Sequence, residues 1–275
     1  FQEIYSQFTG YVADYDNLLS DKKRLMIGKE LAGDVDNLAH QLKLVSARDR
    51  YGVDITLYGL RRALVEILAR FPVYRTYITP QGLNPEDEEY LQQAADRAAE
   101  AFPRLANEFS FIRRFLFLQG WQRLTEEERR QWMEFVLRFQ QLCSPIMAKG
   151  FEDTFLYVYN RLLSLNDVGG APERFGQSRR EFHDWIIKRA QSWPHSLNTT
   201  STHDSKRSED VRARLNVLAE LPEEWKDLLG IWQGLNRQHK SRVGRYPAPD
   251  NNDEYLFYQT LLGTYPFRPE ENSDY

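Results

Sequence analysis

The segment LYGLRRALVEILARFP (residues 57–72) decides the fold class, because its apolar residues recur every three or four positions. This spacing predicts an amphipathic helix, and Pro72 ends it because proline cannot supply the next backbone hydrogen bond. The same rhythm runs through the preceding residues 16–49, which we predict to form one long helix. The chain is therefore predicted to be mainly helical.

Helix start signals extend this pattern along the chain. Several combine a capping side chain with a proline or an acidic residue in the first turn: Asn84 with Pro85, Thr125 with Glu128, and Ser178 with Glu181. Apolar periodicity predicts further helices at about 208–220, 222–239 and 254–264.

Strand signals are scarce. The Thr-rich segment LNTTST (197–202) is the best candidate, and VYRTYI (73–78) is a weaker one. Residues 240–253 are polar and proline-rich, which indicates a surface loop. We therefore expect one or two strands in the chain.

Composition excludes several classes of protein. Of the 275 residues, 41% are hydrophobic and 28% are charged, which excludes a disordered chain, and no apolar run is long enough to span a bilayer. The 36 Lys and Arg residues against 40 Asp and Glu argue against a nucleic-acid partner. The single cysteine, Cys143, cannot form an internal disulfide, which indicates an intracellular protein.

The first candidate for chemistry is STHD (201–204), at the end of the best predicted strand. A carboxylate at the C-terminal end of a strand, with a histidine beside it, suits the active site of a barrel enzyme. The alternative is a turn whose Asp and Ser cap the next helix. Spacing alone leaves both hypotheses open for His203 and Asp204.

The second candidate is MAKGFEDT (147–154), in which Lys149, Glu152 and Asp153 lie within five residues. Such a cluster can bind a polyhydroxylated ligand, because lysine donates hydrogen bonds and carboxylates accept them. The alternative is a solvated helix end with Gly150 as its C-cap.

Other patterns favour plain structural roles. Four aromatic residues lie close together in the sequence: Phe151, Phe155, Tyr157 and Tyr159. Aromatic side chains can stack on sugar rings, but at helical spacing they more often belong to the hydrophobic core. DVDNLAH (34–40) superficially resembles a sugar-binding motif but lies within a regular helical pattern. Cys143 is predicted to be a small buried thiol, and the histidines show no metal-ligand spacing.

Four segments together carry a specific resemblance: FPVYRTY (71–77), SPIMAKGFEDTFLYVYNRLLSLNDVGG (144–170), WPHSLNTTSTHDSKRSEDVRARLNVLAELPEEW (193–225) and DEYLFYQTLLGTYP (253–266). The strongest signatures within them are MAKGFEDT and THDSKRSEDVRAR. In this order, and over nearly the whole chain, the sequence resembles the maltooligosyltrehalose synthases of the α-amylase superfamily. The resemblance implies a (β/α)8 barrel with large helical insertions. It implies that residues 1–130 form a helical insertion domain and that residues 131–275 form a late barrel portion with one or two strands.

The resemblance also implies a reaction. Enzymes of this family convert the reducing-end α-1,4 linkage of a maltooligosaccharide into an α,α-1,1 linkage, an isomerisation in trehalose biosynthesis. The implied roles are transition-state stabiliser for Asp204, binding of the same sugar for His203, and binding of the released glucose for Lys149 and Glu152. Tyr74 and Arg75 match another segment of the family, without an assigned role. No metal or organic cofactor is implied, and the implied partner is a maltooligosyltrehalose trehalohydrolase.

The family's nucleophile and general acid/base have no match in this chain, so we expect that the chain alone turns over no substrate. It starts at Phe1 without a methionine, as expected of a piece of a longer protein. The alternatives are a non-catalytic helical module that binds glucan or a partner protein, and a plain fragment. If this piece folds alone, the surfaces that would face the barrel must be covered by repacking or by a second copy of the chain. Self-association is therefore expected.

Overall fold

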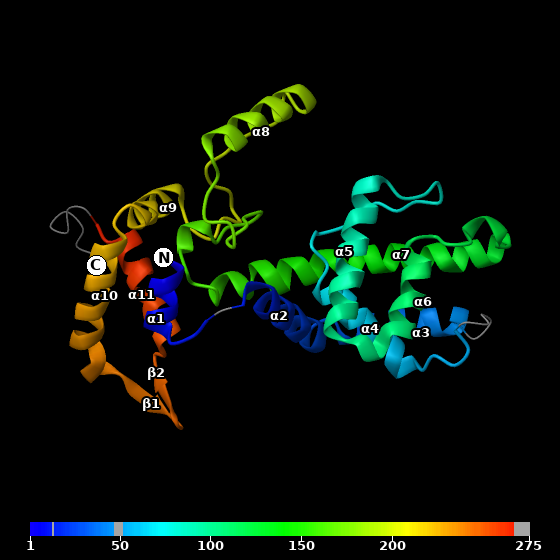
Figure 1. Ribbon diagram of the computed structural model, residues 1–275, viewed down its shortest axis with the longest axis horizontal. Helices are drawn as coiled ribbons and strands as arrows, with labels where there is room; N and C mark the ends of the chain where they lie inside the picture. Colours follow the sequence, from blue (N-terminus) through cyan, green and yellow to red (C-terminus); the bar gives the residue numbers. More distant parts are fainter. Residues whose placement is uncertain (13, 47–51, 267–275) are drawn as a thin grey trace. The chain divides into compact units, whose positions relative to one another are not determined.

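The computed structural model describes residues 1–12, 14–46 and 52–266 (Figure 1). Its contacts divide the chain into two compact units, which are described one at a time. The first, here called the bundle, is Asp14–Phe155. The other, here called the second unit, joins Phe1–Ala13 to Leu156–Tyr275.

The bundle is built around helix α4 (Leu57–Ala69), the helix predicted from its apolar spacing. Most of the side chains of α4 are buried, because α4 contacts each of the other long helices of the bundle. These helices are α2 (Tyr15–Lys29), α3 (Ala32–Ser46), α5 (Pro85–Ala101), α6 (Ala106–Leu116) and α7 (Glu126–Ile146). A helix with apolar residues on most of its surface is expected at such a central position.

The single helix predicted over residues 16–49 is wrong in one respect. The chain turns at Glu30 and Leu31, so that α2 and α3 are separate helices, and residues 47–49 lie outside the described residues. Both helices pack against α4. One straight helix of this length would extend beyond the face of α4, so the turn lets both apolar faces become buried.

The predicted helix starts are confirmed. The Asn84 side chain accepts a hydrogen bond from the backbone N–H of Asp87 at 2.7 Å. Thr125 and Ser178 form reciprocal capping boxes with Glu128 and Glu181 respectively, at the starts of α7 and α8 (Arg179–Ser192).

The second unit has an aromatic core. Helices α1 (Gln2–Thr9), α9 (Glu209–Asn216), α10 (Pro222–Asn236) and α11 (Asn251–Thr264) contribute to it. Tyr5, Trp225 and Tyr255 are almost completely buried there, and the Trp225 indole N–H donates to the Tyr255 hydroxyl at 3.1 Å. The ring contacts between these residues fix α1, from the start of the chain, against α11 near its end.

The strands lie elsewhere than predicted. β1 (Ser241–Val243) and β2 (Tyr246–Ala248) form an antiparallel hairpin inside the segment expected to be a loop. Gly244 supports the turn with φ 61°. Residues 197–202 and 73–78 are not strands, because no neighbouring segment pairs with either of them. An extended segment becomes a strand only when a partner satisfies its backbone groups.

The mainly helical fold class is thus confirmed, and within the described residues the sheet consists of this hairpin alone. The predicted domain division at residue 130 lies inside the continuous helix α7, whereas the contacts divide the chain at 13/14 and 155/156. That division concerned which residues belong to an insertion and which to a barrel, and it stays a prediction. No helix among the described residues is long and apolar enough to cross a membrane.

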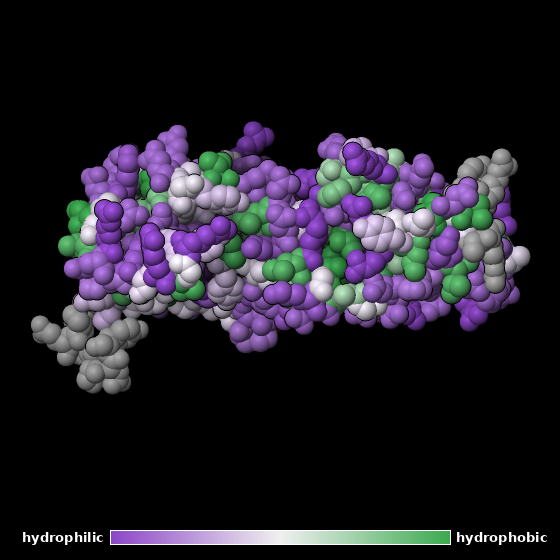
Figure 2. Space-filling model, turned by 90° about the horizontal axis from the view of Figure 1, so that it is seen from below, coloured by the Kyte–Doolittle hydropathy of each residue, from purple (hydrophilic) through white to green (hydrophobic). Residues whose placement is uncertain are grey.

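Helix α8 is unlike the others because none of its residues is buried. Within the second unit it stands apart from α1, α9, α10 and α11 (Figure 1). Phe182 and Trp185 are 50% and 53% exposed on this helix, and Trp193 just after it is 71% exposed. On the face that Figure 2 shows, hydrophobic residues reach the surface in separate patches among hydrophilic ones. Because none of the residues of α8 is buried, no other part of the described chain covers its apolar side.

Candidate functional site

Lys149 and Glu152 lie on an unusual helical turn. Helix α7 continues beyond Ile146 as a π-helical turn, Met147–Glu152. Pro145 has no backbone N–H, so it removes one hydrogen bond from the last regular turn just before the π-helical one. Turns of this kind are rare and frequently occur at functional sites.

Gly150 allows this turn to approach helix α2. A Cβ atom at position 150 would lie 2.9 Å from Cα and 2.7 Å from Cγ of Lys23. Gly150 is buried and lies inside the turn. The alternative that it is the C-cap of a solvated helix end is therefore wrong; the glycine is required by close packing.

Gly150→Ala is expected to destabilise the bundle, because the backbone of α2 blocks the added methyl group. Overpacking of this kind costs about 1–3 kcal/mol. Urea unfolding followed by circular dichroism measures the change. Gly28→Ala is the matched control on α2, where a Cβ atom would have nothing within 4 Å, and it is expected to be neutral or stabilising. Equal stability of Gly150→Ala and the parent chain would contradict the packing argument.

Glu152 has a partner that sequence reasoning did not find. The hydroxyl of Tyr74 donates a hydrogen bond to the Glu152 carboxylate, and the Ser144 hydroxyl donates to the Tyr74 carbonyl at 3.0 Å. Tyr74 is partly buried, and this partial burial raises the pKa of its hydroxyl; the hydrogen bond to Glu152 and the charge of Glu152 raise that pKa further. The only sequence signal for Tyr74 was its place in the FPVYRTY segment.

Lys149 also lies at this site. Its ammonium group pairs with Asp153 at 2.7 Å, and its side chain is 57% exposed. The Thr154 hydroxyl donates to the Lys149 carbonyl at 2.7 Å, which ties the end of the turn to its start. The Lys149 ammonium group and the Glu152 carboxylate thus lie on one turn, and the Tyr74 phenol from another segment is hydrogen-bonded to Glu152. Together these groups can donate to and accept from sugar hydroxyls.

His203 and Asp204 lie on an exposed turn of the second unit. The His203 Nε2 atom is 3.1 Å from Asp204 Oδ2, and their side chains are 90% and 69% exposed. Asp167 stabilises this turn. Its carboxylate accepts a hydrogen bond from the Lys206 backbone N–H at 3.2 Å and forms an ion pair with Arg212 at 2.8 Å. The Asp204 carboxylate is therefore exposed to solvent on a turn that Asp167 stabilises.

Asp204 does not cap the following helix. The N-cap of α9 is Ser208, whose hydroxyl accepts from the Val211 backbone N–H, and Ser201 accepts from the Glu209 backbone N–H at 3.2 Å. Part of the alternative hypothesis is thus correct, since a serine of STHD supports the helix start. The only side-chain partner that the described residues give to the Asp204 carboxylate is His203.

The predicted site residues fall into two pairs in different units. Lys149 and Glu152 lie in the bundle, whereas His203 and Asp204 lie in the second unit. The structure brings the members of each pair together on one turn. The roles implied for these four residues stay predictions.

The residues interpreted as structural behave largely as expected. Phe151, Phe155 and Tyr159 are buried, whereas Tyr157 is 43% exposed and lies near the cations of Lys206 and Arg207. Residues 34–40 lie within α3, as interpreted. Cys143 is buried, as predicted, and burial raises the pKa of its thiol.

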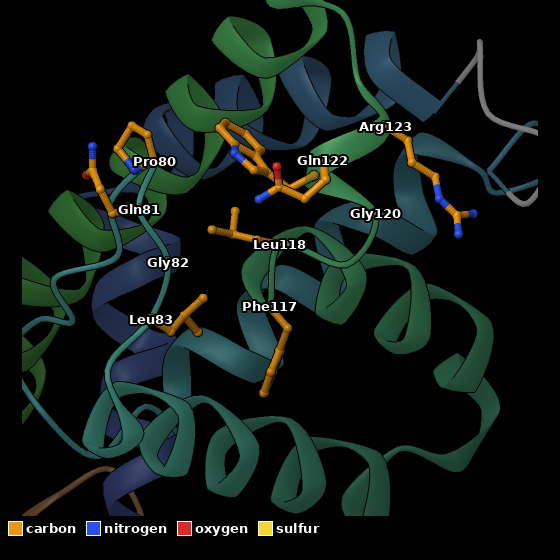
Figure 3. A pocket seen from close by; sticks show the side chains of 10 residues that line it. Pro80, Gln81, Gly82, Leu83, Phe117, Leu118, Gly120, Gln122 and Arg123 are labelled. Carbon is orange, nitrogen blue, oxygen red and sulfur yellow. The ribbon is translucent and has the colours of Figure 1, made fainter.

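A separate hollow of about 580 Å³ lies in the bundle, between the loops at 80–83 and 117–123 (Figure 3). Leu118 and Gln122 point into it, whereas Arg123 points away from the other lining side chains. None of the predicted site residues lines it. Its walls combine apolar side chains with polar ones such as Gln81 and Gln122.

No family model matches the chain. The similar proteins and solved structures are named as maltooligosyltrehalose or glycosyltrehalose synthases. The chain is 42% identical over 137 residues to a protein of Mycobacterium tuberculosis named as a maltooligosyl trehalose synthase, a match that covers 50% of this chain and 17% of that protein. The structure resembles the maltooligosyltrehalose synthase of Arthrobacter ramosus with a TM-score of 0.76 and 33% identity, over 98% of this chain and 30% of that one. It also resembles a glycosyltrehalose synthase, DSM5389, with a TM-score of 0.67 and 33% identity, over 96% of this chain and 28% of that one.

Proposed function

Because this chain corresponds in sequence and fold to a part of the maltooligosyltrehalose synthases, we propose that it supplies the central to late part of such an enzyme. The complete enzyme would convert the reducing-end α-1,4 linkage of a maltooligosaccharide into an α,α-1,1 linkage. The observation that carries the proposal is the 33% identity and TM-score of 0.76 to the Arthrobacter ramosus enzyme across 98% of this chain. The chain spans about 30% of the length of that enzyme.

In this proposal Asp204 stabilises the transition state. Positive charge builds at the anomeric carbon during glycosyl transfer, and an ionised carboxylate placed beside it lowers the barrier. His203, 3.1 Å from Asp204, binds hydroxyl groups of the same sugar. The exposed turn supports this assignment because its carboxylate is not engaged in capping its own helix.

Lys149, Glu152 and Tyr74 would hold the released reducing-end glucose. That glucose must turn and present its anomeric hydroxyl before water attacks the glycosyl-enzyme. The Tyr74–Glu152 hydrogen bond keeps two acceptor groups, the phenol oxygen and the carboxylate, beside each other for sugar hydroxyls, and Lys149 supplies a donor. Tight binding there favours isomerisation over hydrolysis.

The wider expectations follow from the same proposal. The bundle would be the main body of a helical insertion, and the later residues would complete a (β/α)8 barrel with strands from outside this chain. The enzyme would act in the cytoplasm without an organic cofactor or metal, beside a maltooligosyltrehalose trehalohydrolase that releases trehalose.

The test compares this chain alone with a chimera in which it replaces the matching part of the Arthrobacter ramosus synthase. With maltopentaose as substrate, loss of reducing ends measures isomerisation. We expect no activity from the chain alone and measurable isomerisation by the chimera.

A folded chimera without activity would argue against the proposal, and weak isomerisation by the chain alone would show that the missing carboxylates are not needed. Glucan binding by the chain without activity in the chimera would support a binding module instead.

Self-association of the isolated chain is a further expectation, and the apolar side of α8 supports it. A second copy could cover Phe182 and Trp185, which are otherwise about half exposed. Sedimentation velocity over a range of concentrations is expected to show a mass above 32.5 kDa. Trp185→Lys is expected to weaken the association, while Lys188→Met on the same helix serves as the control. A monomer at all concentrations would contradict this proposal.

A further inference from the structure

Lys23 is a buried cation beside the candidate glucose-binding residues. Its side chain lies on α2 and is only 2% exposed. The ammonium group donates a hydrogen bond to the Phe71 carbonyl at 2.8 Å. Burial lowers the pKa of this ammonium group to about 8, which reflects the unfavourable surroundings of the charge.

The same lysine touches both segments that meet at the Tyr74–Glu152 hydrogen bond. Its ammonium group holds the carbonyl of Phe71, three residues before Tyr74. Its Cα and Cγ atoms lie against Gly150, two residues before Glu152. Nothing larger than glycine fits at position 150, so the distance between α2 and the π-helical turn is set at Lys23.

We propose that Lys23 is a positioning residue that holds Tyr74 and Glu152 at hydrogen-bonding distance by fixing one segment through its ammonium group and the other through its stem. The inference rests on the proposed function for its meaning in catalysis, since the pair would bind the reducing-end glucose. The geometry itself does not depend on that function.

An apolar residue would fill the same space at a lower cost. A buried ammonium group with few partners is unfavourable, whereas a methionine stem would pack without a charge. Methionine cannot donate a directional hydrogen bond to the Phe71 carbonyl. Loss of this bond would remove one of the contacts that fix the segment leading to Tyr74, while the Ser144–Tyr74 hydrogen bond and the packing of Gly150 against residue 23 would remain.

The test uses Tyr74 as its own reporter. Replacing it with 3-fluorotyrosine through a reassigned stop codon gives a single fluorine signal in the intact chain, and its pH titration reports the hydrogen bond to Glu152. In the parent chain the reporter is expected to titrate at higher pH than in the chain unfolded in urea. Glu152→Gln removes the charge and defines the full downward shift of the midpoint.

Lys23→Met is expected to lower the titration midpoint by at least half of the shift caused by Glu152→Gln. Combining the two substitutions is expected to add little further shift, because both act on one hydrogen bond. Lys29→Met, an exposed lysine on the same helix, is the control and is expected to leave the midpoint unchanged. A midpoint equal to the parent's in folded Lys23→Met overturns the proposal.

If Lys23→Met does not fold, Gly150→Ala provides the second variant. It displaces the turn from Lys23 at the other contact and is expected to lower the midpoint as well; an unchanged midpoint would likewise overturn the proposal. The titration needs no sugar, so an inactive chimera would count against the proposed function and leave this inference standing.

Discussion

Asp204→Asn is expected to reduce isomerisation by the chimeric synthase by about 10³-fold, with most of the loss in kcat. Asparagine has nearly the same shape and keeps a hydrogen-bonding side chain, but it lacks the negative charge that opposes the developing oxocarbenium ion. A residue that acts mainly in the transition state lowers kcat and kcat/KM together. Loss of reducing ends from maltopentaose over a range of concentrations measures both parameters.

The matched control for this substitution is Asp184→Asn on helix α8, which is also exposed and also lies in the second unit. It is expected to leave the rate unchanged. Because Asp204 has no capping role in α9, the Asp204→Asn protein is expected to unfold at the same urea concentration as its parent. A tenfold effect or less on kcat, in a folded protein, would contradict the assignment of Asp204 as transition-state stabiliser.

Lys23→Met is expected to stabilise the isolated chain at neutral pH while loosening the Tyr74–Glu152 pair. The pKa of the Lys23 ammonium group falls from 10.5 to about 8 on folding. Below pH 8 both states carry the proton, and the folded state bears the whole cost of the buried charge, about 3 kcal/mol. The lost hydrogen bond to Phe71 offsets about 1 kcal/mol of the gain. The variant is thus expected to be more stable by roughly 2 kcal/mol at pH 7.

The difference should shrink as the pH rises from 8 to 10.5. In this range the folded parent loses the Lys23 proton while the unfolded chain keeps it, so the stability of the parent increases relative to that of the variant. Cys143 titrates in the opposite sense, since burial raises the pKa of its thiol in the folded state. That effect is largely shared by the two proteins, so the difference between their urea-unfolding free energies isolates Lys23. A difference independent of pH across this range would contradict the buried-cation interpretation.

For Lys23→Met we thus expect a more stable chain but a looser Tyr74–Glu152 pair. Lys23 would therefore lower the stability of the folded chain while it fixes the geometry of the site. Buried polar groups that lower stability are often retained where a site needs a fixed geometry. In the chimera, Lys23→Met is accordingly expected to shift the product ratio towards hydrolysis even though the chain is more stable. Separate assays for glucose release and for loss of reducing ends would measure that ratio.

Much of the local structure could be predicted from the sequence because its causes are local. The caps at Asn84, Thr125 and Ser178 depend on residues three positions away, and the helix at 57–69 depends on the spacing of its own leucines. The break at Glu30 could not be predicted in this way. It depends on how α2 and α3 pack against α4, which are contacts distant in sequence.

The prediction of strand positions was wrong for the same reason. Residues 197–202 have the composition of a strand but no pairing partner, whereas Ser241–Ala248, inside the segment predicted to be a loop, pairs with itself across a glycine turn. Strand propensity describes a residue's fit to a sheet surface, and the sheet must be supplied by other residues. Composition therefore could not decide where the pairing occurs.

By itself the sequence determined that the chain is mainly helical, where most helices begin, and which short motifs relate it to the maltooligosyltrehalose synthases. These features lie in the spacing and identity of residues that are close along the chain. Only the tertiary structure paired Tyr74 with Glu152, 78 positions apart, and placed Lys23 against Gly150. Such contacts form because helices bury their apolar faces together, and the residues that meet at those faces are set by packing across the whole unit.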